Sequence, residues 1–257
     1  MSVGSAIMVL PQKKGSHMTS LIRSKDRKVT NAVTPNGKQA SIANTFGIPS
    51  GKAFSCPGAT SVCESVCYAG KLEKVFKGVR VNLLHNWDLL KDADIETMTD
   101  LLDEMITEFV KDCEKRSAEK LFRIHWDGDF FSKEYTFAWA AVIIKHADVQ
   151  FWAYTRSDFA VPILQGISNL GLFFSTDDDN RELGKSLKQT YGVKLAFLAK
   201  TFAEGKAGML PISPKSAIPC PENNGKIKMI DEGGSACVKC SQCVFARNDI
   251  LFSATKK

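Results

Sequence analysis

The alternation of strand-like and helix-like segments in the middle of the chain constrains its fold more than any other feature. Strand-like segments begin at residues 121, 149, 171 and 193, so 28, 22 and 22 residues separate successive starts. Helix-like segments fill the intervals. Neighbouring parallel strands need a crossover of about a dozen residues or more, which is usually a helix. We therefore predict an α/β fold with parallel strands, and so few clear strands favour a partial TIM-barrel-like (β/α) repeat over a complete barrel.

The segments that precede the first of these strands predict helices. VNLLHNWDLL (81–90) has helical character, and apolar residues recur at helical spacing in ADIETMTDLLDEMITEFVKDCEKR (93–116). Cys113 lies on the apolar face of the second helix, so we predict that it is a packed core residue and not a ligand. Further upstream, ASIANTF (40–46) predicts a short strand.

Composition divides the chain into three parts. GSHM at 15–18 is typical of an expression-tag scar, so residues 1–17 are predicted to be a tag or disordered. Residues 18–204 hold the (β/α) repeat, with a cysteine loop near its start. From 205 to 257, glycine, proline and cysteine replace the periodic hydrophobic residues. This change predicts a cysteine-rich, cluster-binding tail that packs on the repeat.

The overall composition, with 44% hydrophobic and 24% charged residues, is that of a globular protein with one sizeable core. No apolar run approaches the roughly 20 residues that span a bilayer. The AIMVL segment near the start is too short for a secretory signal. We therefore expect a cytoplasmic protein without a membrane partner. The net charge of +6 permits an anionic partner without requiring one.

Eight cysteines in a reducing compartment favour metal or cluster ligation over disulfides. The tail contains a C-x2-C-x2-C motif at Cys237, Cys240 and Cys243, and Cys220 lies upstream, directly before a proline. This spacing matches the bacterial ferredoxin arrangement for a [4Fe–4S] cluster, whereas zinc sites usually pair two separated C-x2-C motifs. We favour an iron–sulfur cluster, with zinc and free thiols as the alternatives.

A second group of cysteines lies in SCPGATSVCESVCYAG (55–70). Small residues and a Cys-Pro step suit a tight loop. Its three thiolates, Cys56, Cys63 and Cys67, leave one iron of a cubane open for a substrate or cofactor. They can instead complete a site shared with the tail, or hold zinc together with a histidine such as His85. A lone histidine on a helix is, however, more often a packed residue.

Polar residues follow each predicted strand, where parallel α/β folds usually place their functional groups. At the first strand end, alternation predicts that His125, Asp127 and Asp129 share one face, with Ile124 and Trp126 on the other. We predict that Asp129 binds a cationic amine and that His125 donates a hydrogen bond or carries protons. An Asp-Gly-Asp sequence is equally typical of a turn or a helix cap.

Tyr154 and Arg156 occupy the next strand end and are also candidate catalytic residues. A guanidinium group there suits a carboxylate or phosphate, and a structural salt bridge to a nearby aspartate is the alternative. The TDDDN run (176–180) suggests Mg²⁺, but it precedes a helix, so we predict that it caps that helix. Basic segments at 23–28 and 71–80 flank the cysteine loop and keep nucleic acid open as a partner.

Three motifs in order, CPGATSVCESVCYAG, RIHWDGDFFSKEYTFAW and FWAYTRS, carry a family resemblance. Over roughly residues 50–245 the chain resembles the phage and plasmid "gene product 88-like" family of unassigned function. The resemblance implies a bacteriophage protein that works in the host cytoplasm. The family name itself implies no chemistry.

More distantly, the chain resembles radical S-adenosylmethionine enzymes, in which a three-cysteine loop holds a [4Fe–4S] cluster with one open iron. In that likeness Gly128 and Asp129 take the part of the motif that binds the amino group of S-adenosylmethionine, and Tyr68 is the aromatic residue beside the last cysteine. The C-x6-C-x3-C spacing here differs from the usual C-x3-C-x2-C. The tail cysteines then correspond to an auxiliary cluster.

The sequence thus predicts a phage-encoded [4Fe–4S] protein with a radical-SAM-like repeat, an enzyme acting at the open iron on an unknown small molecule. The alternative is a non-catalytic iron–sulfur or zinc protein that senses redox state or binds nucleic acid or a host protein. No nucleotide-binding loop, dinucleotide fingerprint or nucleophile elbow is present in the sequence.

Overall fold

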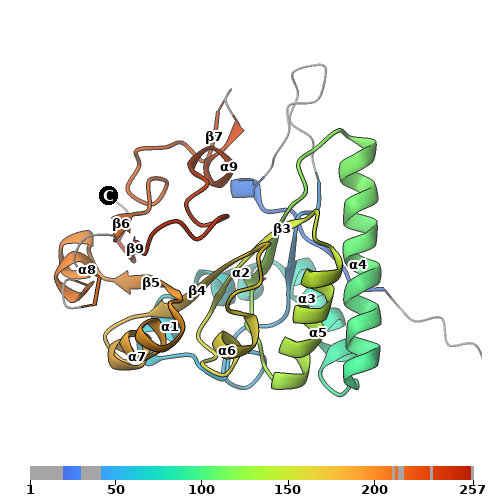
Figure 1. The fold of residues 1–257 in the computed structure, drawn as a ribbon, viewed down its shortest axis with the longest axis horizontal. Coiled ribbons are helices and arrows are strands. Elements are labelled where there is room, and N and C mark those ends of the chain that lie inside the picture. Colours follow the sequence, from blue (N-terminus) through green and yellow to red (C-terminus); the bar gives the residue numbers. More distant parts are fainter. Residues whose placement is uncertain (1–19, 30–41, 210–211, 214–216, 232–233, 256–257) are drawn as a thin grey trace, which may run out of the picture.

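A seven-stranded sheet organises the molecule (Figure 1). The structure is a computed structural model and describes residues 20–29, 42–209, 212–213, 217–231 and 234–255. Every described pairing within this sheet is parallel. In sheet order the strands are β1 (Thr45–Gly47), β2 (Leu121–Asp127), β3 (Gln150–Thr155), β4 (Leu170–Thr176), β5 (Lys194–Ala199), β9 (Ile250–Ser253) and β6 (Ile218–Pro219).

The predicted α/β architecture with parallel strands is confirmed. The four strands that the sequence predicts are β2 to β5, and they lie side by side in chain order. The crossovers between them contain α5 (Lys133–Lys145), α6 (Ala160–Leu164) and α7 (Arg181–Tyr191). β1 and β6 lie at opposite edges and no described strand joins them, so the described sheet is open and does not close into a barrel.

The main hydrophobic core lies between the sheet and the helices. Phe122 of β2 is fully buried and meets the ring of Phe109 at 5.0 Å between centroids. Phe109 belongs to α4 (Ile95–Lys115), which with α3 (Lys77–Leu90) confirms the two helices predicted upstream. Cys113 of α4 is fully buried in this core, as predicted.

The C-terminal segment packs on the opposite face of the sheet and also extends it. Trp152 of β3 is buried on that face against Val244 of the tail and Val29 of the short helix η1 (Arg27–Val29). β9 pairs with both β5 and β6, so the tail supplies two strands that the sequence does not predict. The remaining tail elements are α8 (Phe202–Met209), β7 (Ile230–Asp231), β8 (Gly234–Ser235) and α9 (Ala236–Cys240).

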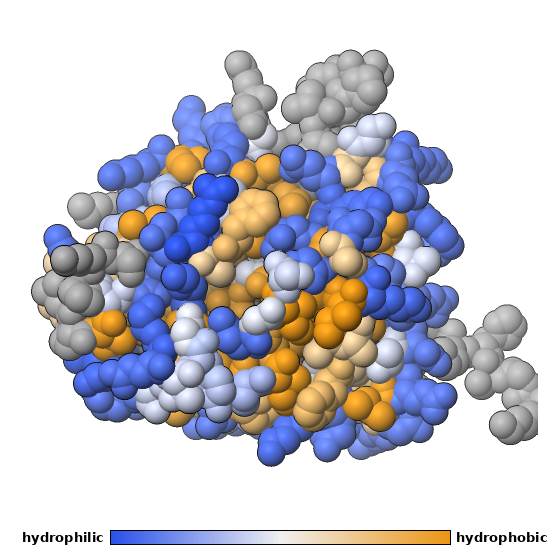
Figure 2. Space-filling view, in the orientation of Figure 1, coloured by the Kyte–Doolittle hydropathy of each residue, from blue (hydrophilic) through white to orange (hydrophobic). Residues whose placement is uncertain are grey.

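Hydropathy differs across the face drawn in Figure 2. Hydrophobic side chains gather in its middle, between the tail and the helices, and charged side chains surround them. No described helix is long and apolar enough to cross a membrane. The predicted tag (1–17) and the first two residues of the strand predicted at 40–46 lie outside the described residues; the end of that strand is β1.

Candidate functional site

The first cysteine segment is largely helical, which corrects the prediction of a simple tight loop. Cys56 lies in a turn, Cys63 lies within α1 (Ser61–Val66), and Cys67 separates α1 from α2 (Tyr68–Val75). Thr60 caps α1 by accepting a hydrogen bond from the Cys63 amide at 3.1 Å. The Cys67 sulfur accepts one from the Gly70 amide at 3.3 Å and so caps α2. We call Cys56, Cys63 and Cys67 the front group.

Two glycines allow this segment to pack closely against the carboxyl ends of β2 and β3. A Cβ atom on Gly58 would collide with the carbonyl of Arg156. Gly128 has a φ of +82°, and a Cβ there would lie 2.5 Å from Ser55 Oγ and 2.6 Å from Ile48 Cγ1. Only glycine tolerates both conditions. Gly128, a predicted cofactor-binding residue, is therefore required by the packing itself, and its predicted role stays untested.

Asp129 lies beneath the front group and ties the two strand ends together. Its buried carboxylate accepts hydrogen bonds from Thr155 Oγ1, from the Arg156 amide and from the Phe130 amide, each at 2.7 Å. Burial raises its pKa to about 6, although these donors oppose the rise. The negative charge of Asp129 contributes to raising the pKa of both Cys56 and Cys63. Its predicted role in amine binding stays a prediction, with three protein donors already bound to the carboxylate.

Arg156 forms a structural salt bridge with a nearby aspartate, Asp177, which is the alternative to its predicted catalytic role. Its Nη1 atom lies 2.7 Å from Asp177 Oδ2 and 3.2 Å from Thr60 Oγ1. The Thr60 hydroxyl in turn donates to Asp177 at 2.5 Å. This buried network joins the ends of β3 and β4 to the start of α1. It places a guanidinium charge beside Cys63, whose pKa burial raises and Arg156 lowers.

The prediction that the TDDDN run caps its own helix is wrong. Asn180 precedes α7, but its side chain accepts no hydrogen bond from that helix; it accepts one from the Asp177 amide instead. Asp179 accepts from the Ser61 hydroxyl and the Val62 amide at the start of α1. The carboxylates of Asp177 and Asp179 therefore bond the start of α1 and not the start of α7.

His125 corrects the predicted alternation along β2. Thr45 pairs with Arg123 and Gly47 with Asp127, so a step of two residues along β1 matches a step of four along β2. The register is therefore irregular here, and His125 adopts a left-handed φ of +58°. As a result Ile124 and His125 are both buried in the core beside α5, and they do not face opposite sides. The His125 Nε2 atom lies 2.9 Å from the Tyr135 hydroxyl. Burial lowers its pKa to about 3, which keeps the ring neutral.

Asp127 forms a buried acidic pair with Glu73, which the sequence analysis does not identify. Asp127 is 2% exposed, and neither of its oxygens has a hydrogen bond of good geometry, although Glu73 and Ser50 lie beside it. Glu73 of α2 accepts from the Ser50 amide at 3.0 Å and from its hydroxyl at 2.6 Å. Burial, followed by the Glu73 charge, raises the pKa of Asp127 to about 8. Asp127 is thus a proton donor near neutral pH, close to Cys56.

Cys220, Cys237, Cys240 and Cys243 form the tail group, on the face of the sheet opposite the helices. Cys243 lies within electrostatic reach of Cys220, Cys237 and Cys240. Burial raises the pKa of Cys237 and Cys243 to about 12, so both are neutral thiols until a metal displaces their protons. Tyr154 of β3, a predicted catalytic residue, is buried here with its hydroxyl beside Cys243. It therefore belongs to the tail group and not to the front group.

Arg123 lies between the two groups. Its guanidinium lies over the Tyr154 ring, 5.7 Å from the centroid, and pairs with Asp26 at 2.8 Å. It lowers the pKa of both Cys237 and Cys243 against the rise caused by burial. On its other side, Nη2 donates to the Tyr68 hydroxyl at 3.4 Å. Tyr68, which follows Cys67, donates that hydroxyl to the Trp126 carbonyl at 2.9 Å.

The donor sets can be compared with the cofactors that the sequence predicts. All eight cysteines are free thiols. Within the described part of the chain, no three His, Cys, Asp or Glu residues are placed to hold one metal ion. The predicted alternative ligand His85 instead bonds the Ser20 carbonyl at 3.0 Å. A four-iron cubane differs from zinc because each thiolate binds a different iron, so its ligands lie farther apart than those of a single zinc ion.

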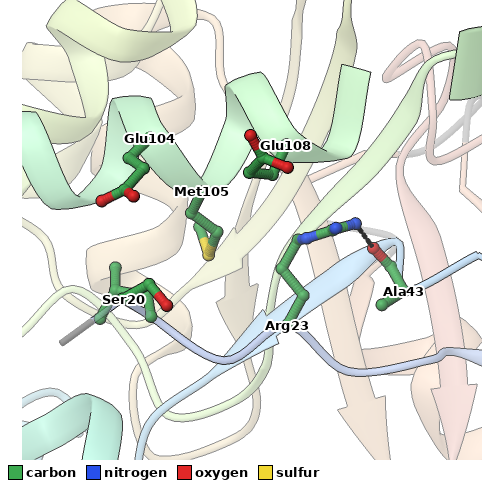
Figure 3. A pocket seen from close by; sticks show the side chains of 7 residues that line it. Ser20, Arg23, Ala43, Glu104, Met105 and Glu108 are labelled. Carbon is green, nitrogen blue, oxygen red and sulfur yellow. Dashed lines mark hydrogen bonds between the residues drawn. The ribbon is translucent and has the colours of Figure 1, made fainter. Parts of the chain in front are cut away.

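One cavity of the molecule lies away from both cysteine groups. It has a volume of about 310 Å³ and is bordered by α4 and by the segment that precedes β1 (Figure 3). Glu104, Met105 and Glu108 line one wall. Arg23 faces them and is already occupied, since it donates to the Ala43 carbonyl and pairs with Asp112, each at 2.7 Å. This cavity contains none of the predicted site residues.

Comparisons with known proteins give one consistent result. Residues 19–246 match a family model described as Gene product 88. The chain is 53% identical over 245 residues to the "Gene 88 protein" of Mycobacterium phage L5, which covers 93% of this chain and 100% of the relative. It is equally similar, 53% over 246 residues with the same coverage, to the "Gene 88 protein" of Mycobacterium phage D29. No solved structure matches the chain.

Proposed function

We propose an iron–sulfur function for this chain, which belongs to the gene product 88 family, as its motifs predicted. The proposal is supported by where the cysteines lie: Cys56, Cys63 and Cys67 near the carboxyl ends of the strands, and Cys220, Cys237, Cys240 and Cys243 in the C-terminal segment, while Cys113 lies in the helix-side core. In this proposal each group holds its own [4Fe–4S] cluster, because the two groups lie at different parts of the sheet.

The front group supplies three ligands, so a cluster there has one iron without a protein ligand. Such a cluster supplies one-electron chemistry at that iron when it is bound. The neighbouring residues of the chain can hold and move protons. Asp127, with a pKa of about 8, donates a proton near neutral pH, and the buried Glu73 lies beside it. The Arg156 guanidinium adds a positive charge that favours the thiolate form of Cys63.

A radical-SAM-like enzyme built on a partial barrel is the sharper form of this proposal. The open iron and the polar strand ends support it. Gly128 and Asp129 support it less, because Gly128 is packed against Ser55 and the Asp129 carboxylate already binds three donors. We propose that any such reaction takes place in the reducing cytoplasm of the phage host.

The second candidate function is a non-catalytic cluster or zinc protein. The burial of the tail group favours it, since Cys237 and Cys243 lie in a hydrophobic cluster with Trp152 and Val244. In this proposal, a cluster or zinc ion bound by the tail group holds the C-terminal segment against the sheet. Structural metal sites can contribute on the order of 10 kcal/mol to folding in this way.

Calorimetry with S-adenosylmethionine separates the two candidates. The full chain, purified and kept without oxygen, is titrated with S-adenosylmethionine, next to a variant in which Cys56, Cys63 and Cys67 are replaced by serine. The enzyme proposal expects heat of binding in the parent and none in the variant, with a changed electron paramagnetic resonance signal of the reduced front cluster. An intact front cluster that gives no heat and no spectral change overturns the enzyme and leaves the non-catalytic protein.

A further inference from the structure

We propose that the outer surface of α2 and the start of α3, residues 68–81, binds single-stranded nucleic acid. We call this the α2–α3 surface. It adjoins the front group, because α2 begins directly after Cys67 and contains Glu73 on its buried side. The inference stands on exposed side chains alone and does not depend on what the cysteines bind.

The charge of the α2–α3 surface has one sign. Between residues 65 and 87 the only acidic residue is Glu73. It is 4% exposed, accepts two hydrogen bonds from Ser50 and pairs with Arg80 at 3.4 Å. Lys71, Lys74 and Lys77 are exposed, and none of them pairs with an acidic residue in the described part of the chain. Such a surface attracts a polyanion.

The spacing of these lysines indicates a ligand with repeating charge. Lys71 and Lys74 are three residues apart on α2, so they project from the same side of the helix. Lys77 is the first residue of α3, directly after the extended residue Phe76. Like charges at this spacing destabilise a helix slightly when nothing neutralises them. A row of phosphates neutralises all three at once.

Exposed rings and apolar side chains lie among the lysines. Phe76, between the two helices, is 53% exposed, and so is Tyr68. Val75 and Val81 are 69% and 64% exposed. Clustered apolar exposure of this kind marks a binding surface. Bases stack on aromatic rings with little regard to sequence, and only single strands expose their bases for stacking, so the combination of rings and lysines favours a single strand over a duplex.

Neutralising the lysines tests the electrostatic half of the proposal. Binding of a fluorescein-labelled single strand of about 20 thymidines, and of a duplex of equal length, is measured by fluorescence anisotropy at several salt concentrations. The Lys71→Gln, Lys74→Gln, Lys77→Gln triple variant is compared with a control of equal charge, Lys133→Gln, Lys206→Gln, Lys226→Gln, whose lysines are exposed elsewhere. The first triple is expected to weaken binding tenfold or more and to reduce the salt slope by about 2. The control is expected to change affinity by less than threefold.

Removing one ring tests the stacking half. Phe76→Ala is compared with Phe137→Ala, because Phe137 of α5 is 51% exposed and so nearly matches Phe76 in exposure. Loss of one stacked base is expected to weaken single-strand binding roughly 5- to 150-fold in the Phe76 variant and not in the Phe137 variant. Circular dichroism checks that every variant is folded.

Three results would overturn the proposal. The first is the absence of single-strand binding at low salt. The second is an equal loss of affinity in the surface variants and in their controls. The third is self-association of the parent that Phe76→Ala abolishes, which would assign the surface to a second copy of the chain. The test is separate from that of the cofactor. Protein that contains no iron but still binds the oligonucleotide through this surface supports the α2–α3 proposal and contradicts only the cluster.

Discussion

At the scale of residues, the polar groups at the strand ends divide into structural and chemical ones. Asp129 and Arg156 are bound by protein partners that join strand ends to the front group. His125 is a neutral core residue with a left-handed backbone. Asp127 is buried like these three, but it lacks a well-formed hydrogen bond and lies beside another acid, Glu73. In the proposed function, proton donation at this edge is therefore assigned to Asp127.

Replacing Asp127 by asparagine should change how stability depends on pH. The carboxyl has a pKa of about 8 in the folded protein and its ordinary value near 3.8 when unfolded. The proton is held more tightly in the folded state, so its stabilising effect is full below about pH 4 and is lost as pH rises through 8. Between pH 5 and 8 the parent should lose stability relative to Asp127→Asn, by at most about 1.4 kcal/mol per pH unit. Urea unfolding of both proteins at four pH values measures this, and parallel curves would contradict it.

Replacing Gly128 by alanine should destabilise the protein through both strain and collision. The added Cβ meets Ser55 and Ile48 in a backbone with φ of +82°. Gly192 is a matched control, since its φ is +71° but a Cβ there meets nothing within 4 Å. We expect a loss of about 1 kcal/mol for Gly192→Ala and at least about 2 kcal/mol for Gly128→Ala. Denaturant midpoints compare the two; equal losses would show that the front segment does not press on Gly128.

At the scale of elements, the two cysteine groups are built differently. The front group lies in a turn and two short helices at the ends of β2, β3 and β4. Close packing at Gly58 and Gly128 and hydrogen bonds to Asp177 and Asp179 hold it there. The tail group lies on the sheet face and is covered by residues that also extend the sheet through β9. Loss of one group should therefore leave the other in place.

Serine variants of each group test this independence. Replacing the three front cysteines should remove about half of the bound iron and leave the absorption of the tail cluster. Replacing the four tail cysteines should also lower stability, because the tail loses its staple. Cys113→Ala is the control, since Cys113 is a core residue that should keep all the iron. Iron that disappears completely in the front variant would indicate one shared site.

The sequence predicted elements well where periodicity carries the information. β2 to β5 and α3 to α5 and α7 follow from apolar spacing in long segments. α1 and α2 were missed because a segment rich in Cys, Gly and Pro has no clear period. β9 has only four residues, and β6 only two, so neither stands out from loop sequence. The irregularity at His125 has no sequence signal, because histidine in a strand normally keeps the alternation.

In the candidate site, the sequence marked the cysteines but not the residues that surround them. Cys237, Cys240 and Cys243 are marked by their spacing alone. Glu73 was missed because a single acidic residue among basic ones is typical of an exposed surface. Its burial beside Asp127 follows from tertiary packing, which the local sequence does not indicate. Tyr154 was assigned to the catalytic edge, whereas its side chain points toward the tail group, on the sheet face opposite the helices.

At the scale of the whole molecule, one sheet carries helices on one face and a thiol-rich tail on the other (Figure 1). Segments distant in sequence meet at the tail group. Lys28 pairs with Glu222 at 2.7 Å, and Asp26 pairs with Arg123 of β2. The tail group therefore joins the beginning, the middle and the end of the chain. Within it, the thiols of Cys237 and Cys243 have pKa values raised to about 12 by burial, so they are poor ligands unless a metal replaces their protons.

The central claim is that both groups of thiols hold iron and inorganic sulfide. The most direct measurement is the content of iron, acid-labile sulfide and zinc in full-length chain purified without oxygen, together with its visible absorption. The account predicts a brown protein with about eight irons and eight sulfides per chain and little zinc. A colourless protein that contains stoichiometric zinc and no sulfide would contradict it.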